Sequence, residues 1–157
     1  MANKENTDKA LKERDKRVLL IRHAKSDWDD PSLRDFDRPL NSRGKRDAPV
    51  MANRLREKKI KIDAFISSPA KRAKRTASVF AKEFKVKKKE IVFLDKLYGA
   101  EPDIFGEVIK NMDDAFDSIA IFAHNPGLTD FANRLTDVRI DNIPTCGVFA
   151  IKIHTKH

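Results

Sequence analysis

Cysteine and long apolar stretches are scarce in this sequence of 157 residues. Cys146 is its single cysteine, which excludes an internal disulfide and a cysteine-based metal cluster. No apolar run approaches the about 20 residues that a membrane-spanning helix needs. The segment from Met1 to Arg17 is polar and lacks the apolar core of a signal peptide. Together these absences predict a protein of the reducing cytoplasm with no membrane segment.

Glycine-rich phosphate-binding loops are also missing. Neither G-x-x-x-x-G-K-[ST] nor G-x-G-x-x-G occurs in the chain, which argues against the nucleotide-binding folds that depend on those loops. Aromatic residues make up only 8% of the sequence, and it contains no recognisable nucleic-acid-binding motif. A nucleic-acid partner is therefore disfavoured.

Positive charge is what the chain has in excess. Lysine and arginine together number 33, against 24 aspartates and glutamates, and the formal net charge is +9. Such a balance attracts anions, among them phosphorylated proteins and nucleotides. Much of the excess lies in two clusters, Lys71–Arg75 and Lys85–Lys89, whose side chains are mostly expected on a solvated surface. Whether the second cluster docks a partner is left open by the sequence.

Length and composition predict one domain. Hydrophobic residues make up 40% of the chain, enough for one core, and domains most often have about 100–150 residues. Residues 1–16 are charged and lack apolar periodicity, so we expect a polar N-terminal tail there. The domain itself is expected to span residues 17–157.

Short apolar runs alternate with segments of helical periodicity. The runs predict strands at 18–21, 62–66, 91–94, 118–123 and 147–153. Helices are predicted from a cap at Ser42 through Leu55, and over 70–84, 102–111 and 129–135. This alternation predicts an α/β three-layer sandwich with a mostly parallel central sheet flanked by helices. The last strand is expected to be antiparallel or at an edge.

Polar residues capable of chemistry follow three of the predicted strands. Arg22 and His23 come directly after the first strand, Arg72 lies one turn beyond the second, and His124 follows the fourth. In open parallel sheets, ligands bind at the carboxyl ends of the strands. We therefore expect these four side chains to converge, although each alone has a structural explanation, such as an ion pair, an exposed cation or a helix cap.

The chemistry of this set favours phosphoryl transfer. Arginine presents a planar fork of donors that matches phosphate oxygens, and a neutral imidazole is a competent nucleophile near pH 7. His23 could form a covalent phosphohistidine, with Arg22, Arg72 and a protonated His124 balancing the charge. A zinc site is disfavoured, because it needs three or four ligands and the cation would lie among arginines. The two remaining histidines, His154 and His157, are expected at the surface.

Five ordered motifs resemble the histidine phosphatase superfamily, which has the phosphoglycerate mutase-like fold, and in particular its SixA-type phosphohistidine phosphatase branch. They are Val18–Trp28, Arg38–Asn41 with Gly44, Ser67–Ala73 with Thr76 and Ala77, His124–Pro126, and Asn142–Gly147. The resemblance implies that His23 is the phosphorylated nucleophile and that Arg22, Arg72 and His124 bind phosphate. It implies neither a metal nor another cofactor.

The sequence departs from larger members of that superfamily in having no motif that fixes an acidic proton donor. Asp95, Glu101 and Asp103 are nearby in sequence, but surface exposure is expected for each. A missing acid favours substrates with a good leaving group, such as phosphohistidine. Several further residues are left with open roles. Ser26 and Lys25 could touch phosphate, Trp28 and Tyr98 could line the pocket or pack, Asn125 could orient His124 or hold its loop, and Asp37 and Arg38 are expected in loop ion pairs.

Three functions remain open at this point. The first is a monomeric, metal-independent phosphatase that removes phosphate from phosphohistidine on a protein. The second is a phosphomonoesterase acting on a small molecule such as a nucleotide or sugar phosphate, because one fold supports either substrate. The third, of another class, is a basic module that binds phosphoprotein or nucleic acid without turnover. Dependence of turnover on His23 would separate the enzymes from the binding module.

Overall fold

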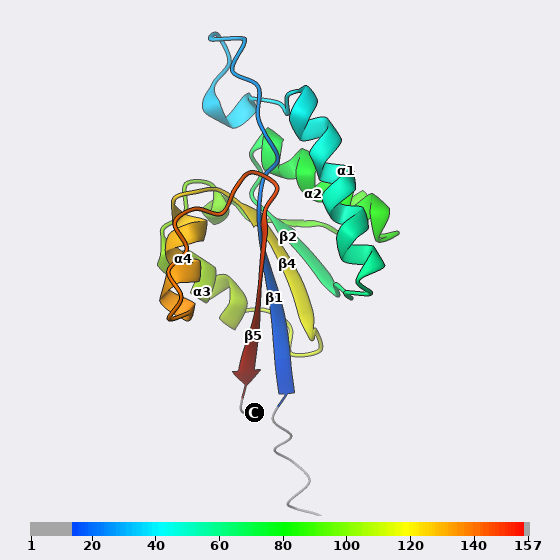
Figure 1. Cartoon of the computed structure of the whole chain (residues 1–157), viewed down its shortest axis with the longest axis vertical. Coiled ribbons are helices and arrows are strands. Elements are labelled where there is room, and N and C mark those ends of the chain that lie inside the picture. The colour runs from blue at the N-terminus through cyan, green and yellow to red at the C-terminus, as the bar shows by residue number, and fades with distance from the viewer. Residues whose placement is uncertain (1–13, 156–157) are drawn as a thin grey trace, which may run out of the picture.

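The computed structural model describes residues 14–155, which form five strands and four α-helices (Figure 1). The strands are β1 (Arg14–Arg22), β2 (Ala64–Ser67), β3 (Val92–Phe93), β4 (Ser118–Ala123) and β5 (Val148–Thr155). The helices are α1 (Ser42–Glu57), α2 (Lys71–Glu83), α3 (Pro102–Lys110) and α4 (Gly127–Leu135). None of these helices is long and apolar enough to cross a membrane.

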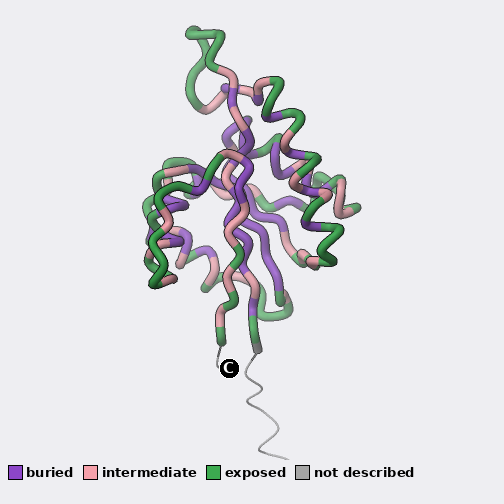
Figure 2. Tube along the Cα trace, viewed as in Figure 1, coloured by how far each residue is buried: buried purple, intermediate pink, exposed green. Residues whose placement is uncertain are grey.

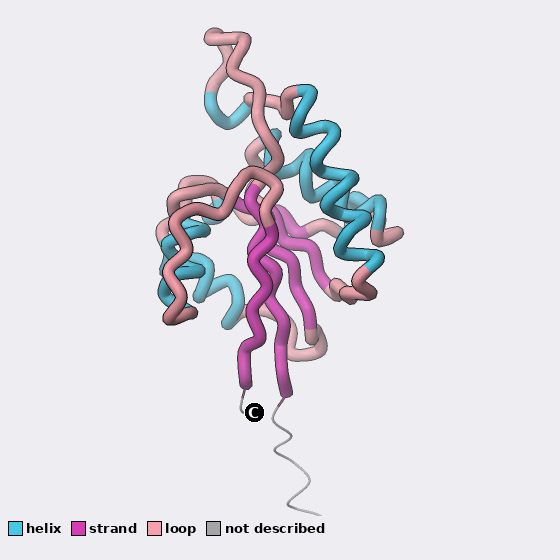
Figure 3. Tube along the Cα trace, in the orientation of Figure 1, coloured by secondary structure: helices cyan, strands magenta, loops and turns pink. Residues whose placement is uncertain are grey.

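The strands make one sheet in the order β3-β2-β4-β1-β5. β1 pairs with β4, and β2 with both β3 and β4, in parallel, whereas β5 runs antiparallel to β1. The predicted mostly parallel sheet is therefore confirmed, and its last strand is both antiparallel and at an edge. The carboxyl ends of β1, β2 and β4 lie at the same edge of the sheet (Figures 1 and 3).

Alternating side chains of the buried strands supply two cores, one on each face of the sheet. Leu19 and Ile21 of β1 join the cluster that packs under α1 and α2, while Val18 and Leu20 point to the cluster under α3 and α4. The central strands are accordingly buried along their length (Figure 2). The two helix pairs on opposite faces complete the predicted three-layer sandwich.

Most element boundaries lie within two residues of their predicted positions, and two of the differences have a clear structural cause. β1 begins at Arg14, four positions before the apolar run, because it pairs with β5 along residues 14–21. The tail expected over residues 1–16 therefore overlaps the strand at 14–16, and its remainder lies outside the described residues. Helix α1 is capped by Asn41, whose side-chain oxygen accepts from Gly44 N at 2.8 Å, and Ser42 is its first residue.

Close contact with α1 holds the loop that follows β1. Gly44 lies against the backbone of Lys25, so closely that a Cβ atom at this position would overlap the Lys25 carbonyl oxygen. The same oxygen accepts a hydrogen bond from the backbone N–H of Asn41 at 3.0 Å. The segment directly after His23 is thus anchored to the first turn of a helix before the longer loop 27–39 projects away.

Candidate active site

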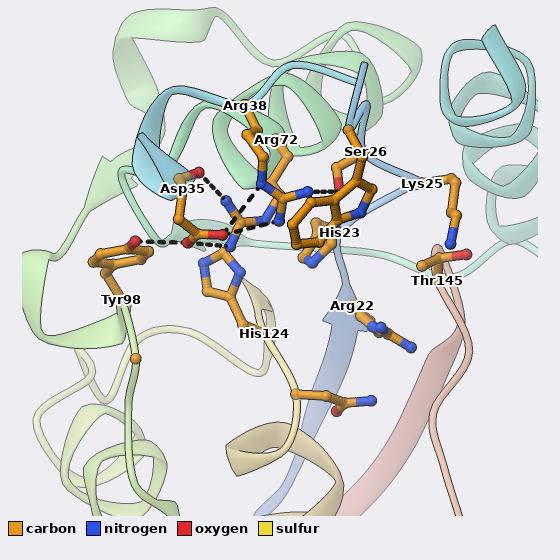
Figure 4. A pocket seen from close by; sticks show the side chains of 13 residues that line it. Arg22, His23, Lys25, Ser26, Asp35, Arg38, Arg72, Tyr98, His124 and Thr145 are labelled. Carbon is orange, nitrogen blue, oxygen red and sulfur yellow. Dashed lines mark hydrogen bonds and ion pairs between the residues drawn. The ribbon is translucent and has the colours of Figure 1, made fainter. Parts of the chain in front are cut away.

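A cavity of about 630 Å³ lies at the carboxyl edge of the sheet, and the four predicted residues line it (Figure 4). Arg22 and His23 come from the end of β1, Arg72 from the first turn of α2, and His124 from the end of β4. The structure thus brings together side chains that are about a hundred residues apart in sequence, as the topology predicted. In the part of the chain that the structure describes, no cluster of three potential metal ligands occurs.

The imidazole of His23 is held in a defined orientation and tautomer. The residue is buried, and its Nδ1 lies 2.7 Å from the carbonyl oxygen of Ala24. Because a carbonyl oxygen can only accept, Nδ1 carries the proton and Nε2 keeps its lone pair. Burial, reinforced by the charges of Arg72 and Arg22, lowers the pKa of His23 to about 4. At neutral pH the ring is therefore an uncharged potential nucleophile.

His124 lies beside this ring, with 5.1 Å between the ring centroids. Its Nε2 is 2.7 Å from Ser68 Oγ, and that hydroxyl oxygen already accepts a hydrogen bond from the backbone N–H of Ala70. The hydroxyl proton can then be donated to Nε2, which places the ring proton on Nδ1. Nδ1 is buried and has no hydrogen-bond partner within residues 14–155. It is a donor available to a ligand.

The expected positive charge on His124 is not found in the free protein. Burial, followed by the influence of His23 and Arg72, lowers the pKa of His124 to about 3. The sequence could not indicate this, because it does not show how completely the ring is enclosed. A neutral His124 still offers the Nδ1–H group as a hydrogen-bond donor.

The two arginines provide further donors. Arg22 donates through Nη1 to the carbonyl oxygen of Ile143 at 3.0 Å, and Arg72 donates through Nη1 to the backbone oxygen of Asp35 at 2.7 Å. The Nε atoms of both arginines are buried without a partner in the described part of the chain. Buried donors are normally hydrogen-bonded, so this cluster has the character of an oxyanion receptor.

Asp35 is a pocket residue that the sequence analysis missed. Its carboxylate accepts from Arg38 (Nη2, 2.9 Å), from Arg72 (Nη2, 3.0 Å) and from the hydroxyl of Tyr98 (2.7 Å), as Figure 4 shows. The hydrogen bond from Tyr98, followed by those from Arg38 and Arg72, holds the pKa of Asp35 well below its usual range. The carboxylate is therefore ionised at neutral pH and cannot act as a proton donor.

The residues with open roles are now placed. Ser26 is buried and accepts from Arg38 at 3.0 Å, and both line the cavity. The Arg38 guanidinium stacks on Trp28, 3.4 Å from the ring centroid, and the partner of Arg38 is Asp35 rather than Asp37, which pairs with Arg34.

Three other groups are found near the site with different roles. Lys25 and Tyr98 line the cavity, and the Tyr98 ring packs edge-on against His124. Asn125 lines it too, but its side chain binds Thr129 and the carbonyl of Ile143, so it holds the loop.

The three candidate acids do not line the cavity. Asp103 pairs with Arg134 on α4, while Asp95 and Glu101 are exposed, as the sequence predicted for all three. Outside the site, His154 is exposed and contacts Asp15 at 2.6 Å, which agrees with its predicted surface position. His157 lies outside the described residues.

Both pocket histidines should remain neutral in mildly acidic solution. Because burial lowers their pKa values to about 4 and about 3, protonation should set in only as the pH falls toward these values. The unfolded chain, with a histidine pKa of about 6.5, binds these protons earlier, so folding stability should fall as the pH drops below about 6.5. ¹⁵N NMR titration of the His154→Gln/His157→Gln variant isolates the two rings. A midpoint near 6.5 for either ring would contradict the burial argument.

Comparison with known proteins was made on sequence and on structure. The family model of the histidine phosphatase superfamily (branch 1) matches residues 18–98. An uncharacterized protein of Mycobacterium tuberculosis is 29% identical over 143 residues, which cover 85% of this chain and 87% of that protein.

Solved structures share the fold over most of the chain. A crystal structure from Agrobacterium tumefaciens assigned to the phosphohistidine phosphatase SixA has a TM-score of 0.77 at 26% identity, covering 86% of this chain and 89% of that one. The protein histidine phosphatase SixA complexed with tungstate also gives a TM-score of 0.77, at 18% identity, with 88% and 94% covered.

Proposed function

Because this chain belongs to the histidine phosphatase superfamily (branch 1) and is a phosphatase, we propose that it removes phosphate from phosphohistidine on a protein, with His23 as nucleophile. One observation supports the assignment of His23 as the nucleophile of a phosphate-binding site. His23, whose Nε2 is unprotonated, lines one cavity together with Arg22, Arg72 and His124, and each of these three side chains has a buried donor without a partner in the described chain, namely Nε of either arginine and Nδ1 of His124.

Two displacements at phosphorus follow from this arrangement. Nε2 of His23 attacks the phosphorus atom, the bond to the leaving nitrogen or oxygen breaks, and the phosphoryl group is carried on His23. Water then attacks the same phosphorus, the bond to Nε2 breaks, and phosphate leaves with the free imidazole restored. The donors of Arg22, Arg72 and His124 stabilise the charge on the equatorial oxygens in both steps.

The leaving group supports the choice of substrate. Asp35 is the only carboxylate among the described residues lining the cavity, and it is ionised, so a departing alkoxide would find no carboxylic acid to protonate it. Phosphohistidine needs no such donor, because its imidazole ring can be protonated before the P–N bond breaks. The relatedness at 26% identity to a structure assigned to SixA supports the same substrate class.

A direct comparison of substrates tests the proposal. We expect kcat/KM for a phosphocarrier protein phosphorylated on histidine to exceed that for the same protein carrying phosphoserine by at least about a hundredfold, the contribution expected of a missing general acid. Phosphate release would be measured in the presence of EDTA, since the proposed mechanism uses no metal.

Two results would contradict the proposal. Equal or faster turnover of sugar or nucleotide phosphates would favour the small-molecule phosphomonoesterase, and loss of turnover in EDTA would contradict a metal-free reaction. A chain that only binds phosphoprotein would show no turnover of either substrate. The monomeric state and the cytoplasmic location stay predictions, which sedimentation and cell fractionation would test.

A further inference from the structure

We propose that Asp35 makes the cavity select its substrate by the charge of the leaving group, favouring cationic leaving groups over those that carry a negative charge. The proposal rests on the proposed function for the chemistry at phosphorus, but it concerns a different property of the site. Asp35 belongs to neither the nucleophile nor the oxyanion receptor.

The carboxylate of Asp35 is fixed in one position by four hydrogen bonds. One oxygen accepts from Nε and Nη2 of Arg38, at 3.2 and 2.9 Å, and the other accepts from Arg72 Nη2 and from the Tyr98 hydroxyl. A side chain held from three directions keeps its charge at a defined place. Its side chain is nevertheless 49% exposed and lines the cavity, so this charge is accessible to a bound molecule.

Asp35 lines the same cavity as His23 but does not contact it directly, because Tyr98, His124 and Arg72 lie between or beside them. The Tyr98 ring, which binds Asp35, packs on His124 with 5.7 Å between centroids, and His124 in turn lies 5.1 Å from His23. Tyr98 is thus separated from the nucleophile by His124, and the carboxylate of Asp35 lies beside Tyr98 and the guanidinium of Arg72, as Figure 4 shows. In an in-line displacement the leaving group departs on the side opposite the attacking atom. A leaving group that departs toward this part of the cavity meets the carboxylate of Asp35.

Among the described side chains that line the cavity, Asp35 carries the single negative charge. Every other charged side chain lining the cavity, Arg22, Lys25, Arg38 and Arg72, is positive. Such a pocket alone would attract any polyanion, including phosphoesters with additional carboxylates or phosphates. Asp35 opposes this attraction at the point where it pairs with Arg38 and Arg72. The protonated ring of phosphohistidine, by contrast, carries positive charge into the cavity and gains a favourable interaction with Asp35, until the P–N bond breaks and the ring leaves as neutral imidazole.

Replacing Asp35 with asparagine tests the proposal, because asparagine keeps the shape and removes the charge. The probes are three aryl phosphates whose para substituent is trimethylammonium, nitro or carboxylate. For each probe, kcat/KM of Asp35→Asn is divided by that of the wild type, which cancels the intrinsic reactivity of the leaving group. Relative to the value for the nitro compound, we expect this ratio to be about tenfold lower for the cationic ester and about tenfold higher for the anionic ester. An effect of this size is expected from one charge acting at short range across a partly solvated pocket.

Two further variants serve as controls. Asp37 lies in the same loop, but its carboxylate pairs with Arg34 and does not line the cavity. The Asp37→Asn variant should therefore have the wild-type kcat/KM for all three esters. Asp35→Glu keeps the charge and should keep the wild-type order of substrates.

The outcomes are decisive in either direction. A uniform decrease for all three esters, or complete inactivity of Asp35→Asn, would show that Asp35 only positions Arg72 and would overturn the proposal. The proposal would also be overturned if Asp35→Glu ranked the three esters by kcat/KM in the same order as Asp35→Asn. Failure of the wild type to hydrolyse phosphohistidine would reject the proposed function, while the aryl series would still decide the role of Asp35.

Discussion

Replacing His23 with alanine is expected to lower phosphatase turnover by about 10⁴-fold or more, the usual cost of removing a nucleophile from an enzyme that works through a covalent intermediate. The oxyanion receptor remains in the variant, but no other side chain in the described cavity offers an unprotonated nitrogen in the position of His23 Nε2. Phosphate release by the wild type and the variant, measured at substrate concentrations well below KM, gives the ratio directly.

A matched control and a trapping experiment sharpen this prediction. His154→Ala removes an exposed imidazole at the far end of the molecule and should retain full activity. Brief incubation with a ³²P-labelled substrate should label the wild type through an acid-labile, alkali-stable bond and should leave His23→Ala unlabelled. Equal turnover in the wild type and His23→Ala, or labelling of the variant, would reject the nucleophile.

Replacing Arg72 with lysine should lower kcat/KM by about 10²- to 10³-fold, although the formal charge is kept. Lysine lacks the buried Nε–H donor of arginine and the planar fork through which Arg72 binds both the backbone oxygen and the carboxylate of Asp35. The loss should appear for every phosphorylated substrate, because all of them present the same phosphoryl group to Arg72.

The control for this variant lies on the same helix. Arg75→Lys changes an exposed arginine one turn along α2, and its kcat/KM should match that of the wild type. Comparable losses in both variants would indicate that α2 is destabilised rather than that a phosphate ligand has been removed. Retained activity in Arg72→Lys would show that charge alone suffices at this position.

Buried strands were the most predictable part of the fold. The expected strand at 118–123 coincides with β4, because all six residues are buried and the segment is correspondingly apolar. The start of β1 escaped prediction, since residues 14–17 are charged and residues 14–16 pair with β5 alone. The apolar character of a local segment predicts that it is buried, but it does not predict pairing with a strand that is more than a hundred residues away in sequence.

The same distinction applies to the site. Arg22, His23, Arg72 and His124 could be placed together because each follows a strand or begins a helix, and the topology of a parallel sheet then fixes where they meet. The place of Asp35 could not be predicted, because this residue lies in a loop whose path is determined by tertiary contacts to Arg72 and Tyr98. Its spacing of three from Arg38, across a one-turn 3-10 helix, was the only local signal.

The position of β1 in the sheet has a consequence for biosynthesis. β1 is the first described strand along the chain and leads directly into His23, yet both of its neighbours, β4 and β5, come from the last third of the chain. While a ribosome is still adding residues, the apolar side chains of β1 have no strand to pair with, and such unpaired edges favour aggregation. His23 therefore gains its native setting only after β5 has been synthesised and has paired with β1.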